Sequence, residues 1–532
     1  MNATLLRGGV VHSPVDPFAT ALLVVGDRVA WVGQDGAAAT HVDAVDQVVE
    51  LDGALVTPAF VDAHVHATDT GLTLTGLDLS VTAGAAQVAD AVAAHAARRP
   101  GEPVLLGHGW DDSREGGRVL SLAALDAAAP GRAVYLARVD VHAALASSAL
   151  RAQVPGLVSL DGYHATGALT GAAHHAVRAA ALGGVSQTMR TAAQRATRER
   201  AAQLGIAALH EMAGPQVSSE QDLAGLLALA RIEPGPAVLG YWGECGGAST
   251  AARLGAVGAA GDVFIDGSLG AGTALLREPY ADRDGHGRGW LSAQHVADHL
   301  VACTRAGLQA GFHVIGDGAM DVACAGLAIA EAEVGTAALR AGRHRLEHVE
   351  MVDTDQVGLL ARLGVVASVQ PVFDELWGGE HGMYAARLGA ARASAMNPWA
   401  AMVAAGVPLA VGSDAPVTPL GPWAAVRAAA AHHTPGSRLS ARAAFAAHTR
   451  GGWRAARVDD AGVLAPGQLA SYAVWAASEL VVQAPDDRVA AWSTDPRSGV
   501  PGLPVLAPDV ALPRCLATVV AGTTVHGHDV VG

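Results

Sequence analysis

The middle of this chain alternates short apolar runs with alanine-rich stretches, and this alternation constrains the fold more than any other feature. Runs of strand length, each followed by a helix-forming stretch, are typical of a parallel sheet with crossover helices. There are eight such runs, the number that a closed (β/α)8 barrel requires. They are AFVDAHVHA (59–67), GIAALHEMA (205–213), AVLGYWGE (237–244), GDVFIDGS (261–268), QAGFHVIGD (309–317), RLEHVEMV (345–352), VVASVQPV (365–372) and VPLAVGSDAPV (407–417).

Polar side chains gather at the ends of these runs. Five of the eight end in His, Asp or Glu. In a barrel, the carboxyl ends of the strands and the loops after them meet around the axis, and barrel enzymes place their reacting groups there. The pattern therefore predicts an active site at that end of the barrel.

The two ends of the chain differ in character from the middle. Residues 1–57 and 458–532 contain short Val- and Leu-rich runs separated by Gly and Asp, which indicates β-strands. We expect one small β-sandwich domain built from both ends, around a barrel that spans 58–457. A stretch at about 70–200 is too long for a loop and indicates an inserted substructure. The predicted fold class is α/β: a (β/α)8 TIM barrel, a β-sandwich formed by both termini and an insert after the first barrel strand.

The composition excludes several classes of protein. Of the 532 residues, 51% are hydrophobic and 16% are charged, which is enough for a large buried core. The net charge of −15, without a basic stripe or finger motif, argues against nucleic-acid binding. No uninterrupted apolar run reaches about 18 residues, so no membrane span is expected. The expected partner is a small-molecule substrate, with a homodimer as the common default.

The cysteines and the N-terminus bear on the cellular compartment. The four cysteines are scattered and form no CxxC pair, which suits a reducing compartment and gives neither a disulfide framework nor a zinc knuckle. The N-terminus lacks the apolar core and cleavage site of a signal peptide. We therefore expect a cytoplasmic protein.

The chain contains no lysine, so all 35 of its basic residues are arginine. Coding bias in a GC-rich genome explains this absence, and the abundant Ala, Gly and Arg fit the same bias. The chemical consequence holds whatever the cause. A Schiff base, a P-loop lysine, a Ser–Lys pair and a carboxylated lysine between two metal ions are all excluded.

A histidine pair ends the first apolar run. His64 and His66 are two residues apart, so on a strand both imidazoles point to the same side. Neutral imidazoles on one face are natural ligands for Zn, Fe or another borderline divalent ion. His313, His348 and Asp414 stand at the ends of the fifth, sixth and eighth runs. Together, these side chains predict a site for a divalent ion with room for a water molecule.

With these motifs, the chain resembles the metal-dependent amidohydrolase superfamily, and within it the branch that includes AepA-like proteins and N-substituted formamide deformylase. The resemblance covers almost the whole chain and rests on VTPAFVDAHVHA, LARVDVHAALASSAL, FIDGSLGAGTALL, FHVIGDGAMD, RLEHVEMV, GSDAPV and AGVLAPGQLASYAV. It implies hydrolysis of an amide- or formamide-type, non-peptide C–N bond in a small molecule by a metal-activated water. The metal ligands that it implies are His64, His66, His313, His348 and Asp414.

One position departs from the family pattern. Relatives with two metal ions usually have a lysine four residues before the aspartate of the DGSLG-like stretch, and here that residue is Asp262. An aspartate reaches less far from the backbone than a carboxylated lysine, so we expect one ion per chain, preferably Zn, with Fe or Mn as alternatives. Glu211 also ends a predicted strand and is a candidate bridging carboxylate. Whether Asp262 or Glu211 takes part in the site stays open at this point.

The resemblance also suggests roles in catalysis. Asp414 is the candidate base, which would carry a proton from the water to the leaving amine. His348 is the candidate electrophile, which would polarise the substrate carbonyl or stabilise the oxyanion. Asp317 is expected to orient a ligand histidine. The histidine pairs 174–175 and 432–433 lie in alanine-rich helical stretches and are expected on solvated faces.

Candidates for substrate binding come from the insert and from the fourth run. Arg138, Asp140 and His142 resemble an insert motif that approaches the active site in relatives, and a structural charge cluster is the alternative. Trp110 in GHGWDDS could line the pocket or belong to a structured turn. Asp266 in the DGSLG stretch is a further candidate.

Other functions stay open at this stage. The same scaffold supports deamination, ester hydrolysis, decarboxylation and isomerisation, because a fold does not fix a reaction. A non-catalytic regulatory protein is a third class, although such a protein has no physical need for converging metal ligands. The metal content of the purified protein separates the enzymatic classes from the regulatory one.

Overall fold

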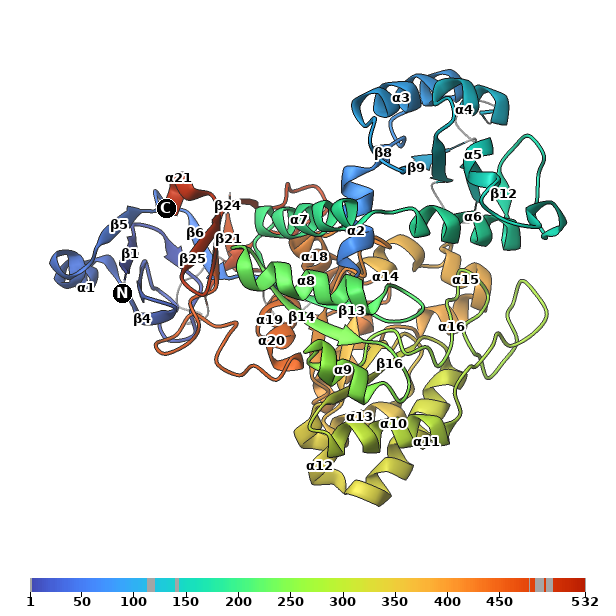
Figure 1. The fold of residues 1–532 in the computed structure, drawn as a ribbon. Coiled ribbons are helices and arrows are strands. Elements are labelled where there is room, and N and C mark those ends of the chain that lie inside the picture. Colours follow the sequence, from blue (N-terminus) through green and yellow to red (C-terminus); the bar gives the residue numbers. More distant parts are fainter. Residues whose placement is uncertain are drawn as a thin grey trace. The chain divides into compact units, whose positions relative to one another are not determined.

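The structure is a computed structural model that describes residues 2–111, 120–138, 143–477, 479–483, 492–493 and 501–531. Contacts within the chain divide it into two compact units, and Figure 1 traces both. Unit 1 comprises residues 1–66 and 198–532, and unit 2 comprises residues 67–197.

The centre of unit 1 is an eight-stranded parallel sheet in the order β19-β18-β17-β16-β15-β14-β13-β7, which confirms the predicted barrel. A parallel bridge between Val65 and Ala415 joins its two edges, and His66 N donates to Ala415 O at 2.9 Å. The sheet is therefore nearly closed beside His66 and Asp414, two of the predicted metal ligands. Its strands are β7 (Phe60–Val65), β13 (Ile206–Ala213), β14 (Ala237–Trp242), β15 (Gly258–Ala259), β16 (Gln309–Val314), β17 (Arg345–His348), β18 (Val366–Val369) and β19 (Leu409–Val411).

The fourth barrel strand lies elsewhere than predicted. The expected strand over 261–268 is wrong, because β15 ends at Ala259 and only Phe264 forms a bridge, to His313. The cause is a tight turn after β15. Gly261 has a φ of +89°, and Val263 N donates to Gly261 O at 2.8 Å.

Helices follow the barrel strands (Figure 1). Ser219, Ser292 and Asp353 cap three of them by accepting backbone N–H groups of the first turn. The helices of unit 1 after β13, within the described residues, are α8 (Glu220–Ile232), α9 (Ala248–Leu254), α10 (Ala293–Arg305), α11 (Asp317–Val334), α12 (Thr336–Gly342), α13 (Thr354–Leu363), α14 (Pro371–Trp377), α15 (Met383–Leu388), α16 (Ala390–Ser394), α17 (Trp399–Ala405), α18 (Pro422–Ala430), η4 (Pro435–Ser437), α19 (Ala441–Ala446), η5 (Ala447–Gly451), α20 (Gly452–Ala455) and α21 (His528–Val531).

Within the described ranges, no single helix has both the length and the apolarity needed to cross a membrane. Only α11 and α12, which meet at a bend of 116°, pass that test when they are taken as one segment.

Both termini contribute to the β-rich part of unit 1, as predicted, and Figure 1 shows the two chain ends there. One sheet has the order β4-β3-β1-β5, and a second, β2-β6-β20-β24-β25, mixes strands from both ends. Strand β6 pairs antiparallel with β20, so neither terminus completes this sheet alone. The strands are β1 (Ala3–Arg7), β2 (Val10–Val11), β3 (Ala21–Val25), β4 (Arg28–Gly33), β5 (Gln47–Glu50), β6 (Leu55–Pro58), β20 (Tyr472–Ala476), β24 (Arg514–Val520) and β25 (Thr523–His526).

Unit 2 is the insert predicted after the first barrel strand. It contains its own five-stranded sheet in the order β12-β11-β10-β9-β8, with a separate apolar core on each side of β10. Its elements are α2 (Ala67–Thr75), β8 (Leu77–Asp78), α3 (Ala85–Arg98), β9 (Val104–Trp110), α4 (Leu122–Ala128), β10 (Ala133–Arg138), β11 (Ala143–Ala146), α5 (Ser148–Arg151), β12 (Leu169–Thr170) and α6 (Gly171–Gly183), before α7 (Gln187–Gln203) leads into unit 1.

Candidate metal centre

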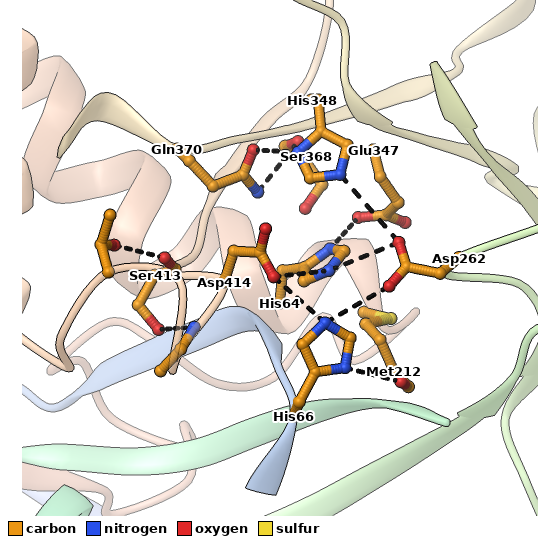
Figure 2. A network of polar contacts seen from close by, with 12 residues as sticks. His64, His66, Met212, Asp262, Glu347, His348, Ser368, Gln370, Ser413 and Asp414 are labelled. Carbon is orange, nitrogen blue, oxygen red and sulfur yellow. Dashed lines mark hydrogen bonds and ion pairs between the residues drawn. The ribbon is translucent and has the colours of Figure 1, made fainter. Parts of the chain in front are cut away.

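The carboxyl ends of the barrel strands bring together five side chains that lie far apart in the sequence (Figure 2). His64 lies on β7, His66 directly follows that strand, and His348 ends β17. Asp262 follows β15, and Asp414 follows β19. The sequence predicted four of the five as metal ligands and left Asp262 open.

The Nδ1 atoms of the β7 histidines each face an oxygen that only accepts hydrogen bonds. His64 Nδ1 lies 3.0 Å from Glu347 Oε2, and His66 Nδ1 lies 3.0 Å from Met212 O. Both Nδ1 atoms therefore donate, and in the neutral rings Nε2 carries the lone pair. This is the form in which an imidazole binds a metal ion.

The Nε2 atoms of the β7 histidines face two carboxylates (Figure 2). Asp414 Oδ1 lies 3.4 Å from His64 Nε2 and 3.1 Å from His66 Nε2. Asp262 places Oδ1 at 3.7 Å from His64 Nε2 and Oδ2 at 3.3 Å from His66 Nε2. Ligands at about 2.0–2.1 Å from a tetrahedral zinc ion lie about 3.3–3.4 Å from one another. These four spacings therefore fit donors around one ion.

Three of these donor atoms are buried and make no hydrogen bond: His64 Nε2, Asp262 Oδ1 and Asp414 Oδ1. A buried charge without a partner carries a large desolvation cost, which a cation at the centre would offset. Among the described residues, two overlapping groups have ligand atoms within 4.8 Å of one another: His64 with His66 and Asp262, and His64 with His348 and Asp414. The residues present fit a divalent ion.

A second pair of histidines lies next to Asp262. His348 Nδ1 is 2.8 Å from Gln370 Oε1 and donates to it, which leaves the lone pair on Nε2, 4.0 Å from Asp262 Oδ1. The His313 ring packs against that of His348, with centroids 4.5 Å apart. His313 therefore borders the donor groups and belongs to neither.

Two site residues have an unusual backbone conformation. His348 has a φ of 72° and Asp414 a φ of 56°, in the left-handed region that non-glycine residues seldom adopt. Strand alternation would place Glu347 and His348 on opposite faces of β17. The left-handed conformation at His348 turns both side chains toward the site. Backbone strain of this kind is concentrated at functional sites.

Burial and charge act in opposite directions on the β7 histidines. Burial lowers their pKa values, but Asp262 and Asp414 outweigh it, so that the pKa of His64 is well above its usual value and that of His66 rises to about 9. Burial, with neighbouring histidines adding to it, lowers the pKa of His348 to about 4. The β7 side of the site thus favours a positive charge, which protons or a metal ion can supply, whereas His348 is neutral.

A buried ion pair that sequence analysis missed holds His64 in place. Glu347 accepts from His64, and Arg345 binds Glu347 through Nε at 2.5 Å and Nη2 at 3.0 Å; neither side chain is exposed. Arg345 Nη2 also donates to Ala63 O and Ser368 Oγ. A carboxylate on the Nδ1 of a ligand histidine fixes its tautomer and orientation. The signal was available, because Arg and Glu two residues apart in RLEH share one face of a strand.

The structure gives Asp266 the position that was expected of Asp317. Asp266 is fully buried, accepts three backbone N–H groups and places Oδ1 3.6 Å from His313 Nδ1. Asp317 Oδ1 instead accepts from the backbone N–H groups of Arg277 and Gly318 at the start of α11. The residue beside a predicted ligand histidine is therefore Asp266, and its geometry fits a positioning role rather than the expected substrate contact.

Glu211 lies buried on β13 and belongs to neither donor group. Its neighbour His210 faces the barrel interior, where His210 Nδ1 lies 3.0 Å from Arg345 Nη1. Strand alternation then directs Glu211 to the other face. Asp262, by contrast, reaches both His64 and His66, so of the two carboxylates that the sequence left open it is the one beside these histidines.

The predicted substrate-binding residues of the insert fall in unit 2. Trp110 is 3% exposed and its Nε1 donates to Leu136 O at 2.8 Å, which makes it a core residue of that unit. Arg138 ends β10 and is half-buried. Asp140 and His142 lie outside the described residues. Substrate contact by these residues stays a prediction.

Two histidines that were expected on the solvated faces of helices are buried: His174 lies on α6, and His432 lies just after the end of α18. His174 on α6 lies 2.8 Å from the Tyr135 hydroxyl, and His432 packs edge-on against Trp399 with ring centroids 4.8 Å apart. The expectation of solvation is wrong for both, because each ring fills a core position with a polar partner nearby.

Comparison with known proteins assigns the family. Residues 47–526 match the model of the amidohydrolase family, which covers most of the chain. This chain belongs to the amidohydrolase family. The putative amidohydrolase YtcJ of Bacillus subtilis (strain 168) is 27% identical to it over 418 residues, 72% of this chain and 74% of that protein. Protein LONG AFTER FAR-RED 3 of Arabidopsis thaliana is 27% identical over 512 residues, 86% of this chain and 84% of that protein.

A solved structure with a similar fold also supports the family assignment. An uncharacterized metal-dependent hydrolase from Pyrococcus furiosus superposes on this amidohydrolase with a TM-score of 0.74 at 25% identity, over 89% of this chain and 98% of that chain. Family membership and this structural relative support a hydrolytic, metal-dependent enzyme. The AepA-like branch within the family stays a prediction.

Proposed function

We propose that this amidohydrolase hydrolyses an amide- or formamide-type, non-peptide C–N bond in a small molecule with the help of a bound divalent ion. The observation that carries the proposal is the convergence of buried donor atoms of His64, Asp262 and Asp414 that make no hydrogen bond, inside the barrel of a hydrolase family. Zinc is the proposed ion, because nitrogen and carboxylate donors at tetrahedral spacing suit it, and Fe and Mn are alternatives with similar ligands.

Asp414 is the proposed base. A divalent ion held by the site would lower the pKa of a bound water molecule toward about 7. Burial raises the pKa of Asp414, but His64 and His66 outweigh this and hold it below its usual value, so the carboxylate is ionised. An ionised carboxylate beside the reacting water can take its proton and return it to the leaving nitrogen.

The contacts of His348 favour one of its two expected roles. Its Nδ1 donates to Gln370, and its lowered pKa of about 4 keeps the ring neutral, so Nε2 carries a lone pair and no proton. That state suits a metal ligand. The electrophile role would require a proton on Nε2, and we therefore propose His348 as a ligand that helps to polarise the carbonyl only through the ion.

The finer assignment rests on motif resemblance. We propose the branch with AepA-like proteins and N-substituted formamide deformylase, and we propose Arg138, Asp140 and His142 as residues that recognise the substrate. Four free cysteines fit the proposed cytoplasmic location, where thiols stay reduced. A homodimer is the proposed assembly.

A substrate screen with the zinc-loaded protein tests this function. Amides, N-substituted formamides and lactams are expected to be hydrolysed with release of an amine, and removal of the ion by a chelator is expected to abolish turnover. The variant Asp298→Asn, on the exposed face of α10, is the control that should keep full activity. Turnover only of esters, deaminase substrates or carboxylic acids would reassign the reaction, and a protein that binds no metal would overturn the proposal.

A further inference from the structure

A buried carboxylate that the proposed chemistry does not use lies just beyond the end of β17. Glu350 is 3% exposed, and its Oε2 makes no hydrogen bond. The chain beyond β17 stays beside the end of β16, because Met351 N donates to Ile315 O at 3.1 Å. Glu350 therefore stands at the carboxyl end of the barrel strands, the end that carries the metal centre.

A second buried polar group faces this carboxylate. Tyr384 on α15 interacts electrostatically with Glu350, and its side chain is 2% exposed. The geometry nevertheless leaves both the Tyr384 hydroxyl and Glu350 Oε2 without a hydrogen bond. Because almost all buried polar groups in proteins have a partner, two adjacent groups without one call for an explanation. A ligand that binds beside both would supply the missing partners.

The charges around Glu350 favour a cation as that ligand. Asp266 and Asp414 lie near enough to repel the charge of Glu350, whereas His313 attracts it. Glu350 belongs to neither of the two groups in the described part of the chain that could hold a metal ion. An organic cation is therefore the ligand whose charge would offset the cost of burying this carboxylate.

A run of aromatic rings connects the metal centre with Tyr384. The Phe373 ring stacks on that of His348 with centroids 6.1 Å apart, and Trp377 packs against Phe373 at 4.6 Å and against Tyr384 at 6.3 Å. These three aromatic residues lie on α14 and α15, which are labelled in Figure 1. Only 4% of the chain is aromatic, so the run is a local concentration. Aromatic faces attract ammonium groups and pack against alkyl chains.

We propose that Glu350 and Tyr384 form a subsite for an ammonium group of the substrate. The inference rests on the proposed function and narrows its substrate class to amides that carry a positively charged amine a few bonds from the scissile C–N bond. Glu350 supplies the counter-charge, and the Tyr384 hydroxyl oxygen accepts an ammonium N–H. Trp377 packs against the chain that joins the two ends of the substrate. Both polar residues bind and select the substrate, and neither takes part in the chemistry.

Three families of amides test the subsite with the zinc-loaded, full-length enzyme. N-acetyl diamines with chains of two to six carbons carry the ammonium group, and matched N-acetyl amines end in a methyl group or a carboxylate instead. Burial raises the pKa of Glu350 to about 7, so assays at pH 8 keep the carboxylate ionised. The best ammonium amide is expected to have a kcat/KM about 10–100-fold above that of its methyl counterpart, the range for hydrogen bonds to a charged group. A preference for the methyl or the carboxylate family would overturn the subsite.

Glu350→Gln keeps the shape of the side chain and removes its charge. This variant is expected to retain its zinc and to lose the preference for the ammonium amide, mainly through a higher KM. Glu375→Gln is the matched control, because it neutralises an exposed carboxylate on α14, and it should keep the full preference. If Glu350→Gln does not fold by circular dichroism, Tyr384→Phe takes its place, with a smaller loss of preference expected. An equal loss of kcat/KM toward all three families would indicate a structural role and overturn the proposal.

The failures of the two proposals differ. Turnover of amides without any preference for the ammonium family would overturn the subsite and leave the function standing. If no amide is hydrolysed, the binding of butylammonium, measured by titration calorimetry, decides about the subsite separately. Tighter binding by the wild type than by Glu350→Gln would support the subsite although the function fails. Equal binding by the two, or none, would show that buried water alone accounts for the unpaired atoms and would overturn both proposals.

Discussion

The two sides of the metal centre are held in place by different means. On the β7 side, which we call the regular side, His64 and His66 follow the two-residue side-chain repeat of a strand, and each Nδ1 is fixed by a hydrogen bond. The other residues of the site, which we call its irregular side, depart from that repeat: His348 and Asp414 have positive φ values, and Asp262 stands on a turn outside the regular strand. One side uses the period of a strand, and the other departs from it.

This difference shows where the protein has fixed its geometry at a cost. A non-glycine residue in the left-handed region costs of order 1–3 kcal/mol and persists only when the surroundings enforce it. At His348, the departure allows two adjacent residues to face the site: Glu347 holds His64, and His348 itself faces Asp262. On β17, two adjacent side chains therefore serve the site where regular alternation would allow only one.

The largest expected effect is at Asp414, where two substitutions distinguish the loss of the carboxylate from the strain of a positive φ. Asparagine keeps the side-chain shape and tolerates the left-handed region, so Asp414→Asn should fold normally and lower kcat by about 10²–10⁴-fold, the usual contribution of a general base. Asp414→Ala should lose similar activity and, in addition, stability, because alanine does not tolerate this φ as well. Steady-state kinetics and thermal melts measure the two effects. Near-normal turnover by Asp414→Asn would rule out its role as the base.

The next effect concerns the ion pair behind the regular side. Glu347→Gln leaves the buried Arg345 guanidinium without a counter-charge, which should cost about 3–5 kcal/mol of unfolding free energy. The binding of Zn²⁺ should weaken by about 10–100-fold, because His64 loses its orienting carboxylate. Denaturant melts of the metal-free protein and chelator competition measure these two quantities.

The surface pair between Glu331 and Arg362 supplies the control for this prediction. Glu331→Gln should change the unfolding free energy by no more than about 1 kcal/mol and leave metal binding unaltered. Equal losses in the two variants would contradict a special role for the buried pair.

The same division decides what could be predicted from the sequence. The barrel and the β7 pair followed from local periodicity, because His64 and His66 obey the two-residue repeat of a strand. Asp414 could be placed by its position after a buried run. These features depend only on neighbours in the chain.

The positions of the residues on the irregular side could not be predicted from local sequence patterns. The turn at Gly261 shifted β15 away from the predicted run and carried Asp262 inward, which no periodicity encodes. The direction of His348 depends on a positive φ, which few non-glycine residues adopt and which the sequence pattern does not indicate. Asp266 and Asp317 both lie near the ends of predicted strands, and only tertiary contacts decide that Asp266 stands next to His313. Long-range packing fixed each of these outcomes.

A glycine substitution tests whether the turn after β15 matters. At Gly261, with a φ of +89°, an added Cβ would lie 2.7 Å from Met212 Sδ, so Gly261→Ala should cost about 2–4 kcal/mol through backbone strain and overpacking. It should also reduce the bound metal by displacing Asp262. Gly358→Ala, inside α13 with open space around it, should instead stabilise the protein by up to about 1 kcal/mol. Denaturant melts and metal analysis give both values, and similar effects of the two variants would show that the turn carries no strain.

The smallest expected effect concerns two buried histidines near the amino ends of β7 and β17. It tests whether the two sides of the site also differ at that end of the barrel. His448 Nδ1 lies 2.9 Å from Val61 O on β7. His344, the residue just before β17, accepts through Nδ1 from the backbone N–H of Ala310 on β16. Burial lowers the pKa of each of these histidines to about 4. A pKa lowered on folding means that the unfolded chain binds protons first, so each neutral ring contributes stability above about pH 6.5 that is lost as the pH falls toward 4.

Each histidine should therefore account for a loss of about 1–2 kcal/mol in unfolding free energy between pH 7 and pH 5. His448→Gln and His344→Gln should each reduce the acid-dependent loss by that amount in denaturant melts recorded across this range. Equal reductions would confine the asymmetry of the two sides to the carboxyl ends of the strands, where the donors are. A reduction in only one variant would show that the β7 and β17 sides already differ at their base, and an unchanged slope in both would mean that neither ring is protonated on unfolding in this range.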